Sequence, residues 1–435
     1  MTEPPDLREG GEGPLGDRPG SFRLFVGRMA IDIRPLRESP QFRRLWIGQA
    51  ISLIGSHISW VAIPYQVYQL TGSTLAVGLV ALCDLIPLAT LAIVGGAIAD
   101  SVDRRRLLLL TEIGLVIVTA CLALNAALPE PHLWPLYVIA FVSTSLWAIG
   151  SPALRSLTPR LVPREQFAAA SALNSVYGAL SHVAGPALSG ILIAAFGLTT
   201  TYLIDVGTYA ASLVAIWRLA PAPPLPEAAR ASVRSVLEGF RFVRRNPVIG
   251  GIFLLDTNAM IFGMPSALFP ALADRRFDAG AEVVGFLYAA PYAGALVAVL
   301  LSGWVRHVGR QGLAVGIAAS IWGLAIVGVG LAETLALCLV MLAIAGAADN
   351  VSAVLRSTIV LDLTPEHMLG RVSGMELAQV AATPALGNLE AGALASFTSV
   401  RFSIVSGGIA CVAGCVAILA LFPALLRYDS RRARE

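Results

Sequence analysis

Residues 104–128 read RRRLLLLTEIGLVIVTACLALNAAL, and this stretch decides the class of the protein. Three arginines open it, and the apolar residues that follow include one charged side chain, that of Glu112. A helix needs about 20 mostly apolar residues to cross the hydrocarbon core of a bilayer. The stretch therefore predicts a membrane-spanning helix that begins at a cluster of positive charge.

Other apolar stretches of similar length occur along the whole chain. With the one above, they begin near Phe42, Leu75, Arg106, Leu133, Arg164, Leu198, Pro247, Gly280, Gln311, Thr334, Met368 and Phe402. Most connections between them are a few residues long, which makes successive helices antiparallel neighbours. A longer polar or amphipathic segment separates the first six stretches from the last six. The pattern predicts an all-α integral membrane protein with twelve transmembrane helices in two sets of six.

Composition excludes most other classes of protein. Charged residues make up 14% of the 435 residues, whereas a soluble domain usually has about 25%. A net charge of +3 provides no basic stripe for nucleic acid. The chain has no lysine, which excludes a Walker A nucleotide site, and it lacks the HExxH and GxSxG motifs of hydrolases. We therefore expect no enzyme activity, no cofactor and no metal site.

The placement of arginine predicts the orientation, because cytoplasmic loops of membrane proteins are enriched in positive residues. With a cytoplasmic N-terminus, the outer loops contain Arg275, Arg276 and Arg401, and all other arginines lie inside. Both termini are therefore expected in the cytoplasm. Residues 1–21 lack a hydrophobic run, so we expect no cleavable signal peptide.

Five segments follow from these spans. They are a cytoplasmic and partly disordered tail over 1–40, a six-helix bundle over 41–220, a cytoplasmic linker over 221–246, a second six-helix bundle over 247–425, and a cytoplasmic tail over 426–435. The linker has an apolar stripe that is typical of a helix lying on the membrane surface, formed by Val233, Val236, Leu237, Phe240 and Val243. A connector between the bundles and a partner-binding helix both fit this stripe.

The two sets of six helices share a pattern of small residues. Gly185 and Gly190 match Gly387 and Gly392 at an offset of 202 positions, and Gly78 matches Gly285 at an offset of 207. Parallel repeats of six spans around a central site are one way in which secondary transporters are built. The sequence therefore predicts two six-helix pseudo-repeats around a central cavity.

Two motifs resemble those of the major facilitator superfamily. Residues 96–106, GAIADSVDRRR, resemble its motif A, except that Ser101 stands where a basic residue is usual and Asp103 where glycine is usual. Residues 181–190, SHVAGPALSG, resemble the span-5 motif of its antiporters, with two serines in place of glycine. The motif positions are Gly96, Asp100, Asp103, Arg104 and Arg105 in the first and Gly185, Pro186, Ser189 and Gly190 in the second.

Further stretches resemble one branch of that superfamily, which holds the enterobactin exporter together with drug and macrolide exporters. They are FRRLW at 42–46, FPALAD at 269–274, GFLYAA at 285–290 and TPEHMLGR at 364–371. The resemblance implies a proton-driven antiporter in the bacterial inner membrane that exports a siderophore by alternating access. Its partners would be a small-molecule substrate, protons and the lipid bilayer, and it would function as a monomer. Multidrug or macrolide efflux is the rival function, and a membrane sensor or scaffold that transports nothing is the alternative from another class.

The motifs suggest mechanical roles. Arg104 and Arg105 can pair with acids on moving elements and form a latch, although they can also serve only to fix the topology. In the superfamily, Asp100 lies at the positive N-terminus of a neighbouring helix. Pro186 removes a backbone hydrogen bond, so the kinked helix and its small neighbours favour a tight outer seal.

Carboxylates within the spans are the candidates for energy coupling, because an ionised acid in the membrane needs a partner, a proton or water. We expect Asp256, Asp349 or Glu376 to take up the proton, and Arg356 to tune that acid or hold an anionic substrate. Arg356 lies seven residues after Asp349 and hence on the same helix face. A permanent Asp349–Arg356 ion pair with a structural role is the alternative. Glu112 and Asp205 are expected to be structural, and Asp84 and Glu390 receive no role.

Aromatic and polar residues on the remaining spans would suit an amphipathic ligand. The candidates for the cavity, besides Arg356, are Trp60, Gln66, Trp147, Tyr177, Asn258, Tyr292 and Asn350. Tyr65 and Tyr288 fit anchors at the membrane interface better. His57 fits a hydrogen-bonded histidine in a helix better than a proton relay.

Overall fold

The computed structural model describes residues 32–223, 233–301, 303 and 308–429. Predictions for residues 1–31, 224–232 and 430–435 lie outside this part. The same holds for the surroundings of Gly96 and the side chain of Asp100 in motif A, and for the side chains of residues 233–237.

The described chain is all α-helical, and its helices come in two series. The N-terminal series is α2 (Arg34–Glu38), α3 (Pro40–Thr71), α4 (Thr74–Ser101), α5 (Arg104–Ala127), α6 (Trp134–Leu161), a 3₁₀ turn η1 (Arg164–Gln166) and α7 (Phe167–Trp217). After α8 (Val233–Arg245) follow α9 (Pro247–Phe262), the 3₁₀ turn η2 (Ser266–Leu268), α10 (Phe269–Phe277), α11 (Ala281–Leu300), α12 (Gln311–Leu331), α13 (Leu335–Leu363), α14 (Glu366–Phe397), α15 (Val400–Leu421) and α16 (Pro423–Arg427).

Capping residues explain where many of these helices begin. Ser39 accepts a hydrogen bond from the Phe42 amide at the start of α3, and Ser73 accepts one from Ala76 at the start of α4. Asn246 accepts bonds from two amides of the first turn of α9, where Pro247 occupies the first helical position. These side chains satisfy N–H groups that have no partner within the helix. Short connections with caps therefore turn the chain back through the membrane.

The predicted fold class is confirmed, with one correction to a single helix. Nine helical segments in the described part are long and apolar enough to span a bilayer. One of them contains α7, whose two arms meet at Gly197. The φ angle there is 77°, in the region that glycine adopts without strain. The nine segments, together with α4, the more polar α14 and the second arm of α7, make the twelve predicted passes. The seventh pass is not continuous, because α9 stops at Phe262 and α10 starts at Phe269.

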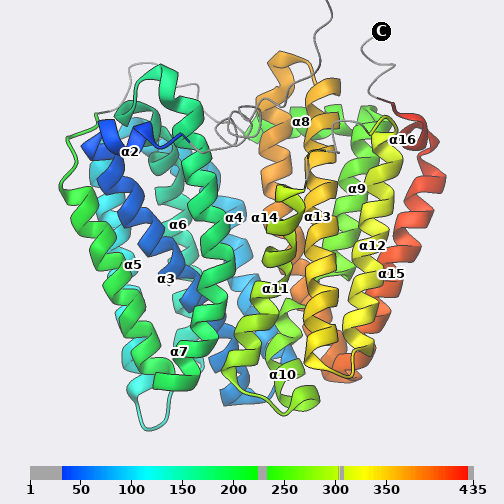
Figure 1. Cartoon of the computed structure of the whole chain (residues 1–435), viewed down its shortest axis with the longest axis horizontal. Helices are drawn as coiled ribbons and strands as arrows, with labels where there is room; N and C mark the ends of the chain where they lie inside the picture. Colours follow the sequence, from blue (N-terminus) through cyan, green and yellow to red (C-terminus); the bar gives the residue numbers. More distant parts are fainter. Residues whose placement is uncertain (1–31, 224–232, 302, 304–307, 430–435) are drawn as a thin grey trace, which may run out of the picture.

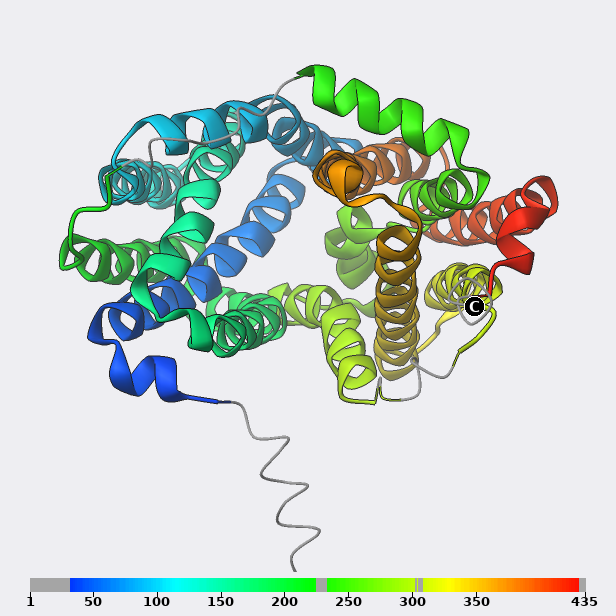
Figure 2. The same ribbon diagram turned by 90° about the horizontal axis from the view of Figure 1, so that it is seen from above.

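The passes form an N-terminal half, α3–α7, and a C-terminal half, α9–α15 (Figure 1). Within the halves, α3 packs along α7, α4 along α6, and α12 along α13 and α15. Between the halves, α4 packs along α14, and α7 along α11. Figure 2 shows α8 running along one edge of the molecule, where it packs on α14. We call the side that carries α2, α8 and α16 the linker side, and the opposite side, with α10, the far side.

The halves meet on the far side. Figure 1 shows their ribbons converging there and spreading apart on the linker side. Four hydrogen bonds join described residues of the two halves, and all four involve the far-side ends of helices. Tyr68 donates to Asp274 (2.9 Å), Arg275 donates to Tyr68 (3.0 Å) and to the Gly72 carbonyl (2.9 Å), and Thr74 donates to the Gly392 carbonyl (2.9 Å).

Two glycine crossings bring the backbones of the halves together at this closed end. A Cβ on Gly190 of α7 would collide with the backbone of α11, and one on Gly285 of α11 would collide with Gly190. Gly78 of α4 and Gly392 of α14 form the second crossing in the same manner. The glycines that match in the sequence repeat thus occupy matching contacts. Small residues allow such close approach of membrane helices.

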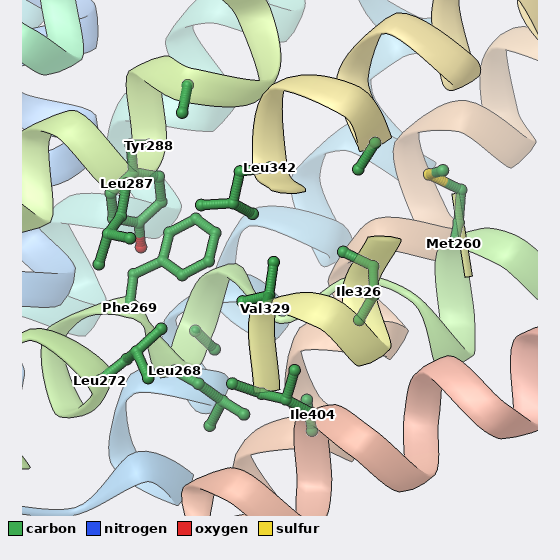
Figure 3. Packing of buried hydrophobic residues seen from close by; sticks show 14 of the residues in the cluster. Met260, Leu268, Phe269, Leu272, Leu287, Tyr288, Ile326, Val329, Leu342 and Ile404 are labelled. Carbon is green, nitrogen blue, oxygen red and sulfur yellow. The ribbon is translucent and has the colours of Figure 1, made fainter. Parts of the chain in front are cut away.

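A continuous core supports the closed end from the C-terminal half (Figure 3). Phe269 of α10 lies edge-on to Tyr288 of α11, with ring centroids 4.9 Å apart. Leu268 and Leu287 beside them are fully buried. This packing fixes the short helix α10 after the interruption of the seventh pass.

Candidate functional site

Two adjoining cavities lie between the halves, with volumes of about 450 and 390 Å³. Residues of both halves line each of them. The residues common to both are Trp60, Ala81, Asp84, Ser266, Tyr288, Tyr292 and Asn388. Because they share so much of their walls, we treat them as one central cavity.

The interruption of the seventh pass forms part of this cavity. Asn388 of α14 accepts hydrogen bonds from the Ser266 hydroxyl (2.7 Å) and the Ala267 amide (2.8 Å). The Tyr288 hydroxyl donates to the Ser266 carbonyl (2.9 Å). These bonds satisfy backbone and side-chain groups that a continuous helix would have paired internally. Irregular backbone at this depth is thus held in place beside a cavity.

In the C-terminal half, an arginine lies between two carboxylates. Arg356 of α13 forms an ion pair with Asp256 of α9, and its Nη2 lies 3.9 Å from Asp349 Oδ1. The Asp256 side chain is 7% exposed, whereas that of Asp349 is 38% exposed and lines the cavity. The structure therefore brings together the three charged groups that the sequence singles out. The stronger pair is Asp256–Arg356, across two helices.

An amide completes the surroundings of Asp256. Gln379 Nε2 of α14 donates to Asp256 Oδ2 (3.1 Å), the Phe253 carbonyl (2.8 Å) and the Thr257 hydroxyl (2.9 Å). Glu376 lies one turn before Gln379 on α14 and is half-buried. Three helices, α9, α13 and α14, thus converge on one group of charges.

The N-terminal half contributes a different carboxylate to the cavity. Asp84 of α4 lines both parts of the cavity, and the Thr144 hydroxyl of α6 donates to its Oδ1 (2.6 Å). Among the described residues, Asp84 has no ion pair. The sequence alone predicts no role for Asp84, because the partner of an acid within a span becomes visible only once the helices are placed.

The two acids of this half that the sequence predicts to be structural are buried in polar contacts and do not line the cavity. Glu112 accepts hydrogen bonds from Gln49 (3.0 Å) and Ser212 (2.9 Å). Asp205 is fully buried and accepts from Ser59 and Thr208. These bonds tie α5 and α3 to the second arm of α7.

Aromatic rings and two histidines make up much of the remaining wall. Trp60 lies edge-on to Tyr288 across the halves, with centroids 5.1 Å apart, and Trp147 lines the cavity from α6. The His57 and His182 rings lie 4.3 Å apart, and His182 is 4.9 Å from Tyr292. The structure thus places Trp60, Trp147 and Tyr292 where the sequence predicts them.

Several other predictions about the cavity need correction. Gln66 is buried against α7, where it accepts a hydrogen bond from Tyr202 (2.9 Å), and Tyr177 packs edge-on against Trp46. Asn258 donates to the Cys411 carbonyl (2.8 Å) on α15. Together with Asn350, these residues lie outside the walls of both cavities. The reason is helix rotation, since helices that are apolar on all sides do not reveal which face is turned inward.

Two predictions were wrong for residues that do line the cavity. Tyr288, predicted to be an interface anchor, is 4% exposed and lines both parts of the cavity. His57, predicted to be hydrogen-bonded, has a buried Nε2 without a partner among the described residues. Tyr288 contacts Trp60 of the other half, and His57 packs on His182 of α7, so both surroundings depend on distant helices.

The family model described as transmembrane secretion effector matches residues 31–432. The chain belongs to this family of the major facilitator superfamily. It is 34% identical over 393 residues to the enterobactin exporter EntS of Shigella boydii, which covers 90% of this chain and 94% of the relative. This transporter is therefore a multi-pass membrane protein and a secondary transporter of small molecules, and not an enzyme.

Solved transporters share its fold. A POT family transporter in complex with 5-aminolevulinic acid has a TM-score of 0.70 at 13% identity, covering 89% of this chain and 97% of its own. A bacterial homologue of the lysosomal transporter Spinster, in an inward-facing conformation, has a TM-score of 0.68 at 15% identity, covering 89% and 95%. These similarities concern the fold alone.

In this transporter, the described part of motif A binds the start of the linker. Asp103 caps α5 and accepts a hydrogen bond from the Ala222 amide (3.0 Å). Arg104 donates to the Ser156 hydroxyl (2.7 Å) and the Pro223 carbonyl (3.3 Å), and Arg105 donates to carbonyls at the end of α7. The expected acids are thus replaced, for Arg105, by backbone oxygens. The motif fastens α5 to the linker in this state.

The span-5 motif lies in the first arm of α7 and faces α3 and α11. The Ser189 hydroxyl donates to the Ile58 carbonyl (2.8 Å), and a Cβ on Gly185 would collide with His57. Gly190 forms the first glycine crossing, and the Pro186 carbonyl packs against Gly285 there. The motif is thus part of the closed far side.

The residues of the candidate site that the sequence left unassigned are Asp84, Thr144, Gln379 and Asn388. Asp84 carried a signal, because an acid within a span marks a site more often than not. The interruption at Gly263 and Pro265 also carried one, as both residues disfavour a continuous helix. Thr144, Gln379 and Asn388 show no signal in the sequence, because their roles depend on partners in distant helices.

Proposed function

We propose that this transporter exports an amphipathic organic compound in exchange for protons, by alternating access of the central cavity. The observation that carries the proposal is the position of Arg356 between buried Asp256 and cavity-exposed Asp349. A carboxylate that faces the substrate cavity and shares a cation with a second acid can change its charge at small cost. Protonation of Asp349 leaves the Asp256–Arg356 pair intact.

The proposed cycle uses this difference between the two acids. When the cavity faces outward, Asp349 takes up a proton and the cavity loses one negative charge. When the cavity faces inward, the proton leaves to the cytoplasm and the restored charge favours substrate binding. Glu376 is the second candidate for this step, because it lies one turn from Gln379, which contacts Asp256. Inward movement of protons then drives outward movement of substrate.

Alternating access would rock residues 41–220 against residues 247–425. We place both termini in the cytoplasm of a bacterium, with the transporter in its inner membrane and acting as a monomer. With that orientation, the spread linker side faces the cytoplasm and the closed far side faces outward (Figure 1). The glycine crossings and the bonds around Tyr68 would then have to part during export.

Two substrate classes follow from different observations. The relative EntS exports enterobactin, which makes a siderophore the first compound to test. Multidrug or macrolide efflux is supported by the cavity itself, which is lined by aromatic rings and by Met260 and Met264. Methionine adapts to ligands of many shapes.

Everted membrane vesicles with an imposed pH gradient test the proposal. The wild-type chain should accumulate siderophore or drug when the lumen is acidic, and the triple variant Asp256→Asn, Asp349→Asn, Glu376→Gln should not. Glu390→Gln on the same helix α14 is the matched control, because Glu390 lies outside both cavities and the charge group. Normal transport by the triple variant would overturn the coupling mechanism. Ligand binding by the wild type without any gradient-driven flux would instead favour the sensor or scaffold.

A further inference from the structure

The central cavity has an acidic wall with no basic counterpart. Asp84 lines both of its parts and Asp349 lines the second. The chain has no lysine, and no arginine is among the described residues that line either part. Arg356 pairs with Asp256 and lies 3.9 Å from Asp349, so Asp84 is the lining acid without an ion pair among the described residues. The described cavity therefore attracts cations and repels anions.

Its two histidines do not reverse this balance. His57 Nε2 is buried without a partner among the described residues, and His182 Nδ1 lies 2.7 Å from the Gly178 carbonyl. The rings are 4.3 Å apart, so two charged imidazoles would repel each other strongly. An imidazolium at His57 would also bury a charged donor with nothing to accept its bond. At most one of the two rings can therefore carry a charge, and His57 fits its surroundings as a neutral ring.

Asp84 itself is arranged as a counter-ion. Its Oδ1 is held by the Thr144 hydroxyl at 2.6 Å, and it has no ion pair among the described residues. Trp60, Tyr288 and Tyr292 line the same two parts of the cavity as Asp84. Trp60 is 38% exposed, so part of its ring surface is open to a ligand. Aromatic faces next to a carboxylate are the usual surroundings of an organic cation.

We infer that the substrates of this transporter are amphipathic organic cations, and that Asp84 is the residue that selects their charge. The inference rests on the proposed function, because it assigns the substrate class of the same cavity. The aromatic rings would receive the apolar body of the substrate, and Asp84 its positive group. Asp349 lines the cavity from the C-terminal half. Its negative charge would be neutralised in turn by the proton and by the positive group of the substrate.

Binding of two ions of equal shape and opposite charge tests the inference. Saturable binding of tetraphenylphosphonium and of tetraphenylborate to the purified full chain in nanodiscs would be measured at pH 7.5. The wild type should prefer the phosphonium by about tenfold or more. Asp84→Asn should weaken phosphonium binding about tenfold, and Asp84→Glu should retain most of it. Asp278→Asn, the same chemical change in an exposed turn on the far side, is the matched control and should bind as the wild type does.

The outcomes separate the inference from the proposed function. A wild type that binds both ions equally, or prefers the borate, overturns the inference even if the Asp84 variants fail to fold. Gradient-driven export of an anionic compound that is unchanged in Asp84→Asn overturns it as well and leaves proton-driven export standing. Phosphonium binding that depends on Asp84, without any gradient-driven flux in proteoliposomes, supports the inference and overturns the proposed function.

Discussion

Asp256 and Asp84 are carboxylates on helices that border the same cavity, yet their surroundings differ in kind. Both oxygens of Asp256 are occupied, one by Arg356 and the other by Gln379, and the side chain is 7% exposed. Asp84 receives one hydrogen bond, from Thr144, and faces the cavity. Asp256 is neutralised by Arg356 within the protein. Asp84 has no such partner among the described residues, and in the inference above the positive group of a substrate takes that place.

The difference suggests that the two acids have different roles, a structural one for Asp256 and a ligand-binding one for Asp84. A buried ion pair is costly to form and more costly to break, so Asp256 and Arg356 fix the relation of α9 to α13. Asp349 lies between the two cases, since it shares Arg356 at 3.9 Å and is exposed to the cavity. In the proposed cycle it is therefore the acid that responds to both the proton and the substrate.

The largest expected effect comes from breaking the buried pair. Asp256→Asn leaves Arg356 with the more distant Asp349 as its described counter-ion, and removal of one partner from a buried pair costs about 3 kcal/mol or more. We expect a loss of that size in the free energy of unfolding, measured by denaturant titration in detergent, together with loss of transport. The double variant Asp256→Asn, Arg356→Gln should recover at least half of the stability, because no unpaired charge remains.

A double variant as unstable as the single one would show that the pair is not what holds α9 to α13. Glu390→Gln serves as the matched control for removing a charge within the membrane. Transport should stay absent in the double variant, since stability and coupling depend on different properties of the same pair. Restored transport would place the proton elsewhere.

An effect of intermediate size is expected for Asp349, whose surroundings lie between those of Asp256 and Asp84. Asp349→Asn keeps the shape of the side chain and leaves the Asp256–Arg356 pair intact, so the free energy of unfolding should change by about 1 kcal/mol or less. Export driven by a pH gradient should be lost, whereas substrate exchange without a gradient should continue. Counterflow in proteoliposomes measures the second property. Wild-type gradient-driven export in this variant would remove Asp349 from the mechanism and leave Glu376 as the candidate.

The fold was predictable because each membrane pass is marked by features within its own stretch of sequence. The length of an apolar run, the arginines at its end and a capping residue such as Asn246 all act within one helix. The repeat-related glycines were also visible, and they form matching crossings. The interruption between α9 and α10 was missed although Gly263 and Pro265 mark it, and the residues that hold it, Asn388 and Tyr288, come from other helices.

The site was predictable only where it is contained in one helix. Asp349 and Arg356 share a face of α13, and their proximity follows from their spacing. Gln66 and Tyr177 were placed wrongly, because an apolar helix gives no sign of its rotation. Asp84 needed the position of α6, which brings Thr144 to it, before it could be told from a structural acid.

The smallest expected effect concerns the bond that holds Asp84. Thr144→Val keeps the volume of the side chain and removes the hydroxyl that donates to Asp84 Oδ1. A lost hydrogen bond is worth about 1 kcal/mol, so phosphonium affinity should fall about fivefold as the carboxylate loses its fixed position. Ser143→Ala, which removes a neighbouring hydroxyl from the same cavity wall, should change the affinity less than twofold. Equal affinities for the two variants would mean that Asp84 acts by its charge alone, and that Thr144 only fills space beside it.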